Sequence, residues 1–378
     1  LVGSEMCIRD RDMATISLCM IVKNEEKVLA RCLDSVKPAV DEIVILDTGS
    51  TDATKDVAAR YTDRIYDFPW VDDFSAARNA SFAKASMTFT MWLDADDVLL
   101  PEDLEALIQL KSQLDTLDAD VIMLPYHTGV DETGAPSCRF FRERLLRTGI
   151  PLTWKGRVHE AIQHQGRSLR LEKPAITHRS IKTVYTDRNL RIYQAQAAAG
   201  EPFSPRDSFY YGRELYYHKR YQEAIKVLED FLRSGRGWVE NNVEACKILS
   251  YCYEGLEDDM GAFGALTSSF FFTPPRAELC CELGRLFMKL RLYPNAIFWY
   301  ELALTCSPAD REGAFMNRDC YGYLPCIQLC VCYDALGDHK TAEAYNRRAG
   351  GYKSTAAYQH NLAYFAELAR HQAKSPCI

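Results

Sequence analysis

The sequence has neither an excess of basic residues nor a long apolar run. Its 378 residues include 45 Lys and Arg against 52 Asp and Glu, a net charge of -7. This balance argues against nucleic-acid binding, which depends on Lys and Arg at phosphates. No run of eighteen apolar residues occurs, so no membrane span is predicted. Hydrophobic residues still make up 47% of the chain, enough for the cores of one or two domains.

Cysteine motifs are also missing, although cysteine itself is not. None of the 14 cysteines belongs to a C-x-x-C pair, so neither a zinc knuckle nor a thioredoxin-type site is predicted. No signal peptide is visible. Many of the cysteines lie in apolar, helix-like stretches such as residues 326–332. We therefore expect buried thiols in a reducing compartment, and a cytoplasmic protein.

The first twelve residues, LVGSEMCIRDRD, fit nothing that follows. We interpret residues 1–12 as a non-native extension and exclude them from the analysis of the fold. Met13 is the expected natural start, because a strand pattern begins just after it.

Between about residues 16 and 180, short apolar runs alternate with helical stretches. The predicted strands are ISLCMIV (16–22), EIVILD (42–47), FTMWLDADD (89–97) and VIMLPY (121–126), and the first predicted helices are 24–36 and 51–61, the second capped by Thr51 or Asp52. This alternation predicts a mostly parallel sheet covered on both faces. Ligands of such sheets bind at the carboxyl ends of the strands, where the groups 23–25, 47–50 and 94–97 lie.

From about Pro205 the pattern becomes wholly helical and repeats itself. Small residues recur twelve positions apart, at Gly212 and Ala224, Ser250 and Ala262, Gly284 and Ala296, and Cys330 and Ala342. Paired small residues let two helices approach closely, and stacked pairs bury a common core. We predict four helical hairpins over residues 205–354 and a capping helix at 355–370. This half resembles the tetratricopeptide repeat.

Two of these polar groups are candidates for binding a ligand or a metal ion. Asp47 precedes Thr-Gly-Ser at a strand end and has free lone pairs for a base or a ribose hydroxyl; the alternative is a turn that caps a helix. In WLDADD (92–97) three carboxylates repel one another unless a cation neutralises them. Mg²⁺ prefers carboxylate and phosphate oxygens, so a divalent metal bound to a diphosphate is one interpretation. Solvated acids before the helix near Pro101 are the other.

Together these segments resemble glycosyltransferase family 2, which has the GT-A fold. The resemblance rests on ISLCMIVKNEEKVLARCLDSV, EIVILDTGSTDAT, DDFSAARNASFAKA and MWLDADD, in the order and spacing of the family. It is strong over residues 14–100 and continues more weakly through RFFRERLLR (139–147) and WKGRVHEAI (154–162). LDTGSTDAT, DDFSAARN and the V-H-E segment are similar to a bacterial subgroup. This subgroup includes lipopolysaccharide-core and peptide S-glycosyltransferases with helical repeats.

The resemblance implies a GT-A domain at 13–195, tetratricopeptide-like repeats at 205–370, and a role for each matching residue. The implied nucleotide-sugar site comprises Asn24, Glu25, Asp47, Arg78, Asn79, Asp94, Ala95 and Trp154. Lys23 stands where the family commonly has an aromatic residue. Asp94 and Asp96 match the D-x-D motif, with Asp96 as the direct ligand of Mg²⁺ or Mn²⁺. His178 is a third candidate ligand or a structural histidine, and Trp154 either stacks on a sugar or packs.

Inverting transfer requires a base that deprotonates the acceptor. Glu160 is the candidate base and His159 the residue that orients the acceptor; a glutamate on a structural turn is the alternative. The expected donor is UDP-linked, and the acceptor a peptide, protein or glycan that the repeats bind, unless the repeats pair two subunits. A second hypothesis is a scaffold with a silent transferase-like domain. The intact acids at 47, 94 and 96 favour an active enzyme.

Overall fold

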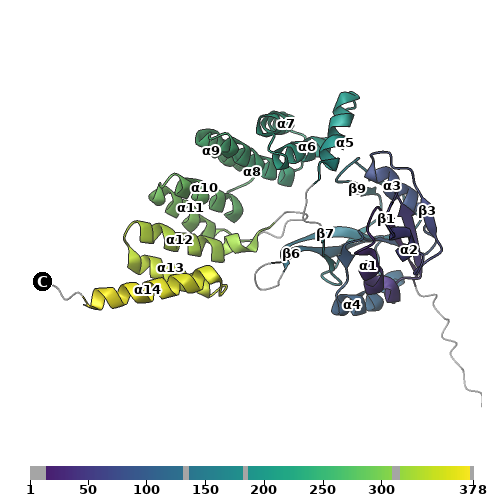
Figure 1. Cartoon of the computed structure of the whole chain (residues 1–378), viewed down its shortest axis with the longest axis horizontal. Coiled ribbons are helices and arrows are strands. Elements are labelled where there is room, and N and C mark those ends of the chain that lie inside the picture. Colours follow the sequence, from purple (N-terminus) through teal and green to yellow (C-terminus); the bar gives the residue numbers. More distant parts are fainter. Residues whose placement is uncertain (1–13, 131–135, 182–185, 309–315, 375–378) are drawn as a thin grey trace, which may run out of the picture. The chain divides into compact units, whose positions relative to one another are not determined.

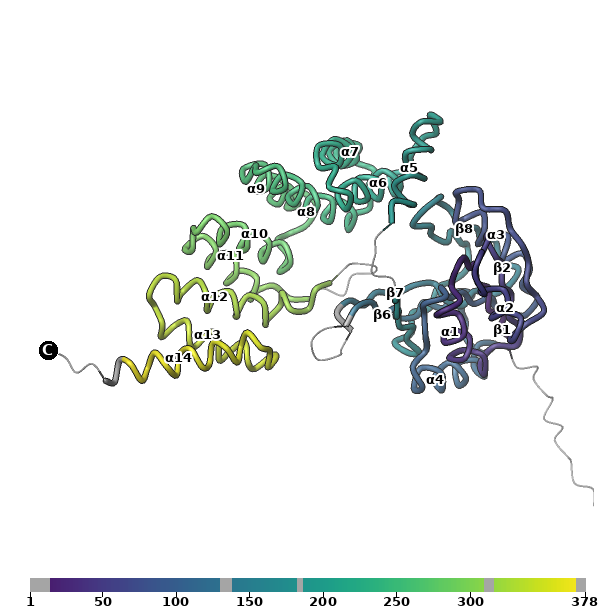
Figure 2. The backbone as a smooth tube through the Cα atoms, in the orientation of Figure 1, coloured from purple at the N-terminus to yellow at the C-terminus, as the bar shows by residue number. Residues whose placement is uncertain are grey.

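The computed structural model describes residues 14–130, 136–181, 186–308 and 316–374. It divides into two compact units (Figures 1 and 2). The first contains the described residues up to Gly129 together with Arg139–Thr186, and the second contains Val130–Cys138 and the chain from Asp187 onward. The predicted extension and the predicted start at Met13 lie outside the described residues.

The first unit is built on a mixed sheet of nine strands, in the order β3-β2-β1-β4-β7-β6-β11-β5, with β10 beside β6. The pairs β1–β2, β1–β4, β2–β3, β6–β10 and β6–β11 are parallel, whereas β4–β7 and β5–β11 are antiparallel. The strands are β1 (Ile16–Val22), β2 (Glu42–Asp47), β3 (Ile65–Asp67), β4 (Phe89–Trp92), β5 (Asp97–Val98), β6 (Val121–Val130), β7 (Pro136–Arg147), β10 (Ser168–Arg170) and β11 (Ile176–His178). The predicted α/β class with a mostly parallel sheet is confirmed.

Helices pack against this sheet. They are α1 (Leu29–Val36), α2 (Thr54–Ala58), α3 (Phe74–Phe82) and α4 (Pro101–Lys111), with the short 3-10 turns η1 (Lys37–Ala39) and η2 (Leu114–Thr116). All of β2 is buried, as expected for a strand covered on both faces. The buried face of α1 consists of Leu29, Cys32, Leu33 and Val36, which is the face that the apolar spacing predicted.

The first two helices are shorter than predicted. α1 begins at Leu29 and not at residue 24, because the preceding residues form a turn in which the carbonyl of Glu25 accepts hydrogen bonds from the N–H groups of Val28 and Leu29. Asn24 has a positive φ of 56°, which an α-helix does not allow. α2 begins at Thr54. The predicted cap Asp52 instead accepts the Thr54 N–H over 3.0 Å from just before the helix.

A small hairpin completes the first unit. β8 (Leu152–Lys155) and β9 (Ala161–His164) form a separate antiparallel sheet of two strands. Trp154 on β8 is 1% exposed, and its ring makes edge contacts with Phe82 and Trp92 at centroid distances of 5.6 and 5.1 Å. The N–H of Phe74 donates to the Arg157 carbonyl over 2.9 Å. These contacts attach the hairpin to α3 and to the end of β4.

The second unit is helical. After α5 (Arg188–Ala198) come four hairpins, α6 (Pro205–Tyr217) with α7 (Tyr221–Arg233), α8 (Val239–Gly255) with α9 (Asp259–Ser268), α10 (Ala277–Lys289) with α11 (Tyr293–Thr305), and α12 (Tyr323–Ala335) with α13 (His339–Gly350). The 3-10 turns η3 (Ser269–Phe271) and η4 (Arg318–Tyr321) lie between them, and α14 (Ala356–Lys374) packs against α13. The predicted hairpins and capping helix are confirmed, with α14 ending four residues later than expected.

The small residues lie where the two helices of a hairpin approach each other. Ala224, Ala262, Ala296 and Ala342 are fully buried. A side chain added at Gly212 would lie 2.5 Å from Leu228 of the next helix, and one added at Gly284 would lie 2.7 Å from the ring of Tyr300. Close approach therefore requires these residues to be small.

The predictions about the cysteines and about membrane-spanning segments can be compared with the described residues. All the cysteines in the described ranges are free, and most are buried, as predicted. Within those ranges no helix combines the length and the apolar character needed to cross a membrane.

Candidate active site

The carboxyl ends of β1 and β2 are tied together by hydrogen bonds around Asn24. Its N–H donates to Ser50 Oγ over 2.9 Å, and its Oδ1 accepts the Thr51 N–H over 2.8 Å. The N–H of Glu25 donates to Thr54 Oγ1 over 2.7 Å. Asn24 and Glu25, both predicted site residues, thus fix the turn that follows β2. Lys23 is exposed beside them.

Asp47 ends β2 beneath this turn and is 2% exposed. Its Oδ2 accepts the N–H groups of Gly49 and Ser50 over 3.1 and 2.9 Å. Gly49 has a φ of 100°, a conformation that favours glycine. Oδ1 of Asp47 is buried and has no hydrogen-bond partner within the described residues. One oxygen therefore holds the turn, as the capping alternative predicts, while the other is a buried acceptor without a partner among the described residues, which is unfavourable for a carboxylate oxygen.

The acidic segment follows β4, and its first carboxylate is paired. Oδ1 of Asp94 accepts a hydrogen bond from Arg78 Nη2 over 2.8 Å. Burial alone would raise the pKa of Asp94, but the charges of Arg78 and Arg144 outweigh it and lower the pKa to about 2. The carboxylate nevertheless remains 41% exposed. Asp94 is thus ionised at neutral pH and accessible to a ligand.

Arg78 joins Asp94 to Glu160. The guanidinium donates from Nε to Oε1 of Glu160 over 2.6 Å, and it lies between the rings of Trp92 and Trp154, 4.6 and 4.8 Å from their centroids. Burial acts against its charged form, but the two carboxylates raise its pKa above the ordinary value. Asp94 of the D-x-D motif and Glu160, the candidate base, are 66 positions apart in the sequence. In the fold both accept a hydrogen bond from Arg78.

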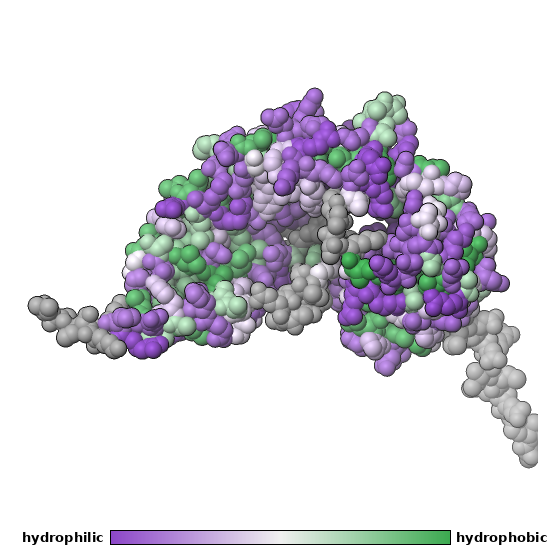
Figure 3. Space-filling model, in the orientation of Figure 1, coloured by the Kyte–Doolittle hydropathy of each residue, from purple (hydrophilic) through white to green (hydrophobic). Residues whose placement is uncertain are grey.

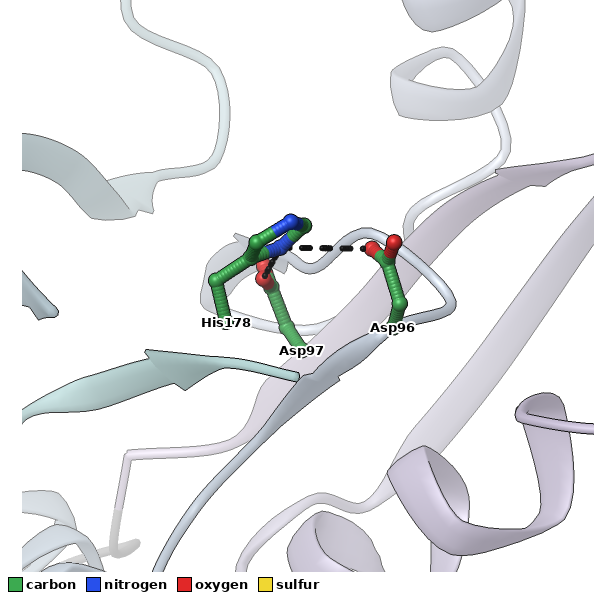
Figure 4. A group of neighbouring side chains, drawn as sticks. All are labelled: Asp96, Asp97 and His178. Atoms are coloured by element: carbon green, nitrogen blue, oxygen red, sulfur yellow. Dashed lines mark hydrogen bonds and ion pairs between the residues drawn. The ribbon is translucent and has the colours of Figure 1, made fainter. Parts of the chain in front are cut away.

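A second group of acids lies around His178 (Figure 4). Nδ1 of His178 is 3.5 Å from Oδ1 of Asp96 and 3.4 Å from Oδ1 of Asp97. One ligand atom from each of these three residues lies within 4.8 Å of the others. The β5–β11 pairing creates the group by placing His178 opposite Asp97. The sequence indicated Asp94, Asp96 and His178 as metal ligands, whereas the structure groups Asp97, and not Asp94, with the other two.

Asp97 is fully buried and already has several partners. Its Oδ2 accepts from Arg144 Nη1 over 3.1 Å and from the Asp94 N–H, also over 3.1 Å, while Oδ1 accepts from the Tyr126 hydroxyl over 2.7 Å. The sequence gives no role to Asp97, because nothing in the run of acids distinguishes the buried member. The hydrogen bond to Asp97 raises the pKa of His178, against the opposing effect of burial, and Asp96 raises it further.

The remaining predicted site residues are Asn79, Trp154, Ala95 and His159. Asn79 donates from Nδ2 to the Trp154 carbonyl over 3.1 Å and accepts the Trp154 N–H over 2.8 Å. Trp154 packs, which is the second of the two roles expected for it, and Ala95 is 6% exposed. His159 has a φ of 51° in the hairpin loop, next to Glu160, whose side chain is 11% exposed.

Comparison with known proteins identifies the type of domain. Residues 17–166 match the model of glycosyl transferase family 2, so this segment is a glycosyltransferase domain, as the sequence motifs indicated. A TPR repeat-containing protein of Synechococcus elongatus is 39% identical over 163 residues, covering 43% of this chain and 39% of the relative. The prophage-derived glycosyltransferase SunS of Bacillus subtilis is 29% identical over 236 residues, covering 58% and 53%.

Among solved structures, residues 1–349 of TarS from S. aureus in complex with UDP-GlcNAc give a TM-score of 0.38 at 15% identity. That match covers 66% of this chain and 90% of that one. The chain spans about half or less of the length of the two curated relatives.

Proposed function

We propose that this chain, in which residues 17–166 form a glycosyl transferase family 2 domain, transfers a sugar from a UDP-linked donor to an acceptor, with metal assistance and inversion. The observation that carries the proposal is the arrangement at the carboxyl edge of the sheet. The acidic segment 94–97 contributes Asp94 to the network with Arg78 and Glu160, and Asp96 and Asp97 to the group with His178. Polar groups at this edge are where an α/β sheet binds its ligand.

The nucleotide is proposed to bind at the ends of β1 and β2. Oδ1 of Asp47 has no partner within the described chain and would accept an N–H of the base or a ribose hydroxyl. Asn24 and Glu25 hold the turn in place through their hydrogen bonds. In this proposal Asp94 faces the sugar or the ribose, while Ala95 and Asn79 shape the site.

The group around His178 has the chemistry of a divalent-metal site. Asp96 contributes a carboxylate that is 15% exposed, and His178 has an Nε2 that does not take part in the contacts of Nδ1. Asp97 is fully occupied by Arg144 and Tyr126, so it serves to orient His178, as partners of metal-binding histidines commonly do. We therefore assign Asp96 and His178 as direct ligands of Mg²⁺ or Mn²⁺. A bound divalent ion would neutralise charge on the diphosphate.

Glu160 is the proposed base. The acceptor oxygen forms a bond to the anomeric carbon and its proton passes to Glu160, while the bond from that carbon to the diphosphate breaks and leaves the electron pair on the diphosphate oxygen. Arg78 holds the carboxylate at 2.6 Å, which fixes the direction in which it accepts the proton. His159, adjacent in the loop, is proposed to orient the acceptor. Attack from the face opposite the diphosphate inverts the anomeric centre.

The helical unit is proposed to bind the acceptor, a peptide, protein or glycan, or else a second subunit. It contains a cavity of about 610 Å³ lined by α7, α8, α9 and η3. Its surface carries hydrophobic areas among hydrophilic ones (Figure 3), and Phe271 beside the cavity is 93% exposed. Such surfaces are typical of protein contact sites. With its reduced thiols, this enzyme is proposed to act in the cytoplasm.

The test is calorimetry with Mn²⁺ and UDP on the parent and on Asp96→Ala. We expect the variant to fold but to lose metal-assisted UDP binding. Asp118→Ala, at an exposed carboxylate that pairs with Arg167, is the matched control and should bind as the parent does. If Asp96→Ala bound Mn²⁺ and UDP as tightly as the parent, the metal assignment would be wrong.

The scaffold hypothesis makes a different prediction. A silent transferase-like domain would hydrolyse no nucleotide sugar, whereas an active enzyme hydrolyses its own donor slowly without any acceptor. A screen of nucleotide sugars with Mn²⁺ or Mg²⁺ therefore distinguishes the two. Hydrolysis by the parent that is lost in Asp96→Ala favours the enzyme.

A further inference from the structure

Three arginine side chains surround one indole ring beside the acidic segment. The guanidinium carbons of Arg144, Arg78 and Arg142 lie 3.9, 4.6 and 5.0 Å from the centroid of Trp92. A cation over an aromatic face is attracted to the ring, but three cations at one ring also repel one another. Each of them therefore needs an anion close by.

Arg142 differs from the other two. Arg78 and Arg144 each form a close ion pair with carboxylates of the site. For Arg142, the nearest carboxylate oxygen within the described chain is Oε2 of Glu143, 3.9 Å from Nε. The described residues provide no hydrogen-bond acceptor for its guanidinium. Among the described residues, Arg142 is thus the arginine at this ring for which no guanidinium donor has an acceptor, whereas Arg144 uses Nη1 and leaves only Nε and Nη2 unpaired.

The cost of this arrangement points to a ligand. The Arg142 side chain is only 28% exposed. Burial lowers the pKa of Arg142, and the neighbouring charge of Arg144 lowers it further. A guanidinium has five N–H donors, and partly removing them from water without acceptors is unfavourable. A substrate anion would relieve both the missing hydrogen bonds and the repulsion.

The strand register places Arg142 at the D-x-D segment. β4 and β7 are antiparallel, with Met91 opposite Leu145. Asp94 lies three residues after Met91, and Arg142 three residues before Leu145, so continuing the register beyond the ladder brings Arg142 opposite Asp94. Arg142 therefore lies near Asp94, whose pKa its charge also lowers, at the end of the sheet where the donor is proposed to bind.

We propose that Arg142 binds a phosphate oxygen of the donor's diphosphate and stabilises the charge that this group gains as the sugar leaves. The inference rests on the proposed function and deepens it. Arginine matches phosphate with two parallel hydrogen bonds, and an interaction that strengthens as charge develops favours the transition state. Arg78 is already committed to Asp94 and Glu160 through Nη2 and Nε, whereas Arg142 has no such partner among the described residues.

The experiment compares UDP and UMP binding, with Mn²⁺ present, to the full chain and its variants. Arg142→Gln removes the charge and keeps a polar, though shorter, side chain. We expect UDP affinity to fall about 10- to 100-fold, the range for losing a hydrogen bond to a charged group, with a smaller fall for UMP. Arg147→Gln is the matched control, since Arg147 lies on the same strand, 33% exposed and 4.7 Å from the ring centroid of Phe89. It should bind UDP as the parent does.

Each outcome bears on the proposal. Parent-like UDP affinity in a folded Arg142→Gln variant would overturn it, as would equal losses for UDP and UMP. If Arg142→Gln does not fold, Arg142→Lys keeps the charge at the ring, and an unchanged preference for UDP over UMP in that variant would overturn the bidentate contact. If the parent itself binds none of UDP, GDP or CDP, the proposed function fails, and this inference fails with it.

Discussion

Arg78 shows how much of this site depends on a single side chain. It is 6% exposed and donates hydrogen bonds to carboxylates from two separate segments of the chain. Removing it would leave two acids near each other without its positive charge, which is costly above all for Glu160, whose side chain is 11% exposed. Both the proposed donor side and the proposed acceptor side of the site therefore depend on its position.

The role of Glu160 is a prediction at the same scale. Replacing it with Gln keeps the shape and a hydrogen-bond acceptor for Arg78 but removes the proton acceptor. Turnover should fall about 10²- to 10⁴-fold, the usual contribution of a general base, while UDP affinity stays near that of the parent. Steady-state kinetics and calorimetry measure the two effects separately.

His159 provides the comparison for that variant. His159→Ala should lose less turnover than Glu160→Gln, because it removes orientation and leaves the base in place. Near-normal turnover in Glu160→Gln would refute the assignment of the base. A product with retained anomeric configuration would refute the inverting mechanism.

We predict from Asp103 that the stability of the fold depends on pH, independently of catalysis. This carboxyl on α4 is 5% exposed, and its Oδ1 accepts the Ala175 N–H over 2.8 Å. Burial raises its pKa above the ordinary 3.8, more than that hydrogen bond lowers it. A raised carboxyl pKa means that the folded state is penalised for holding the ionised form at neutral pH. The penalty disappears as the pH falls through the folded pKa toward the ordinary value.

Asp103→Asn is neutral at every pH and keeps an oxygen for Ala175. It should therefore be more stable than the parent at pH 7, and the difference should shrink as the pH approaches 4. Urea unfolding at both values measures this, with Asp118→Asn at an exposed position as the control. Equal or lower stability of Asp103→Asn at pH 7 would contradict the prediction.

At the scale of elements, the helical hairpins depend on small residues at fixed positions. Gly284 on α10 faces the ring of Tyr300 on α11, and an added methyl group would lie 2.7 Å from that ring. We expect Gly284→Ala to destabilise the helical unit by about 1–3 kcal/mol, the usual cost of overpacking. That cost exceeds the gain of up to ~1 kcal/mol from replacing glycine within a helix.

Gly264→Ala is the matched control, because Gly264 also lies within a helix but has open space around the added methyl group. It should be neutral or stabilising by up to ~1 kcal/mol. Thermal unfolding followed by circular dichroism compares the two variants. Equal melting temperatures for both would show that the hairpin tolerates the added group.

At the scale of the whole molecule, the chain is predicted to separate into two domains between residues 185 and 205. The helical period replaces the alternating one there, and the segment GEPFSP (200–205) precedes α6. Limited proteolysis followed by mass spectrometry should show early cleavage in this range and two resistant fragments. Resistance of the full chain, with first cuts elsewhere, would argue against the boundary.

The sequence alone determined the class of each half. Local patterns in the sequence indicate which faces of an element are buried. Examples are the apolar strand at residues 42–47 and the twelve-residue spacing of Gly284 and Ala296. The polar groups after β1, β2 and β4 were found for the same reason, since acids directly after an apolar run mark a strand end. The roles of the D-x-D acids and of Glu160 followed from the resemblance to the family, and His178 was a candidate because it follows an apolar strand.

Which of these residues lie close together depends on the tertiary structure. The register of β5 against β11 sets Asp97, rather than Asp94, beside His178. The packing of the β8–β9 hairpin on α3 brings Glu160 to Arg78. The sequence did not indicate Arg142 as a binding residue. An arginine in a strand becomes a candidate only when the fold shows that its neighbours leave its charge without a partner. Contacts between residues far apart in the chain are set by strand order and helix packing, which local patterns do not encode.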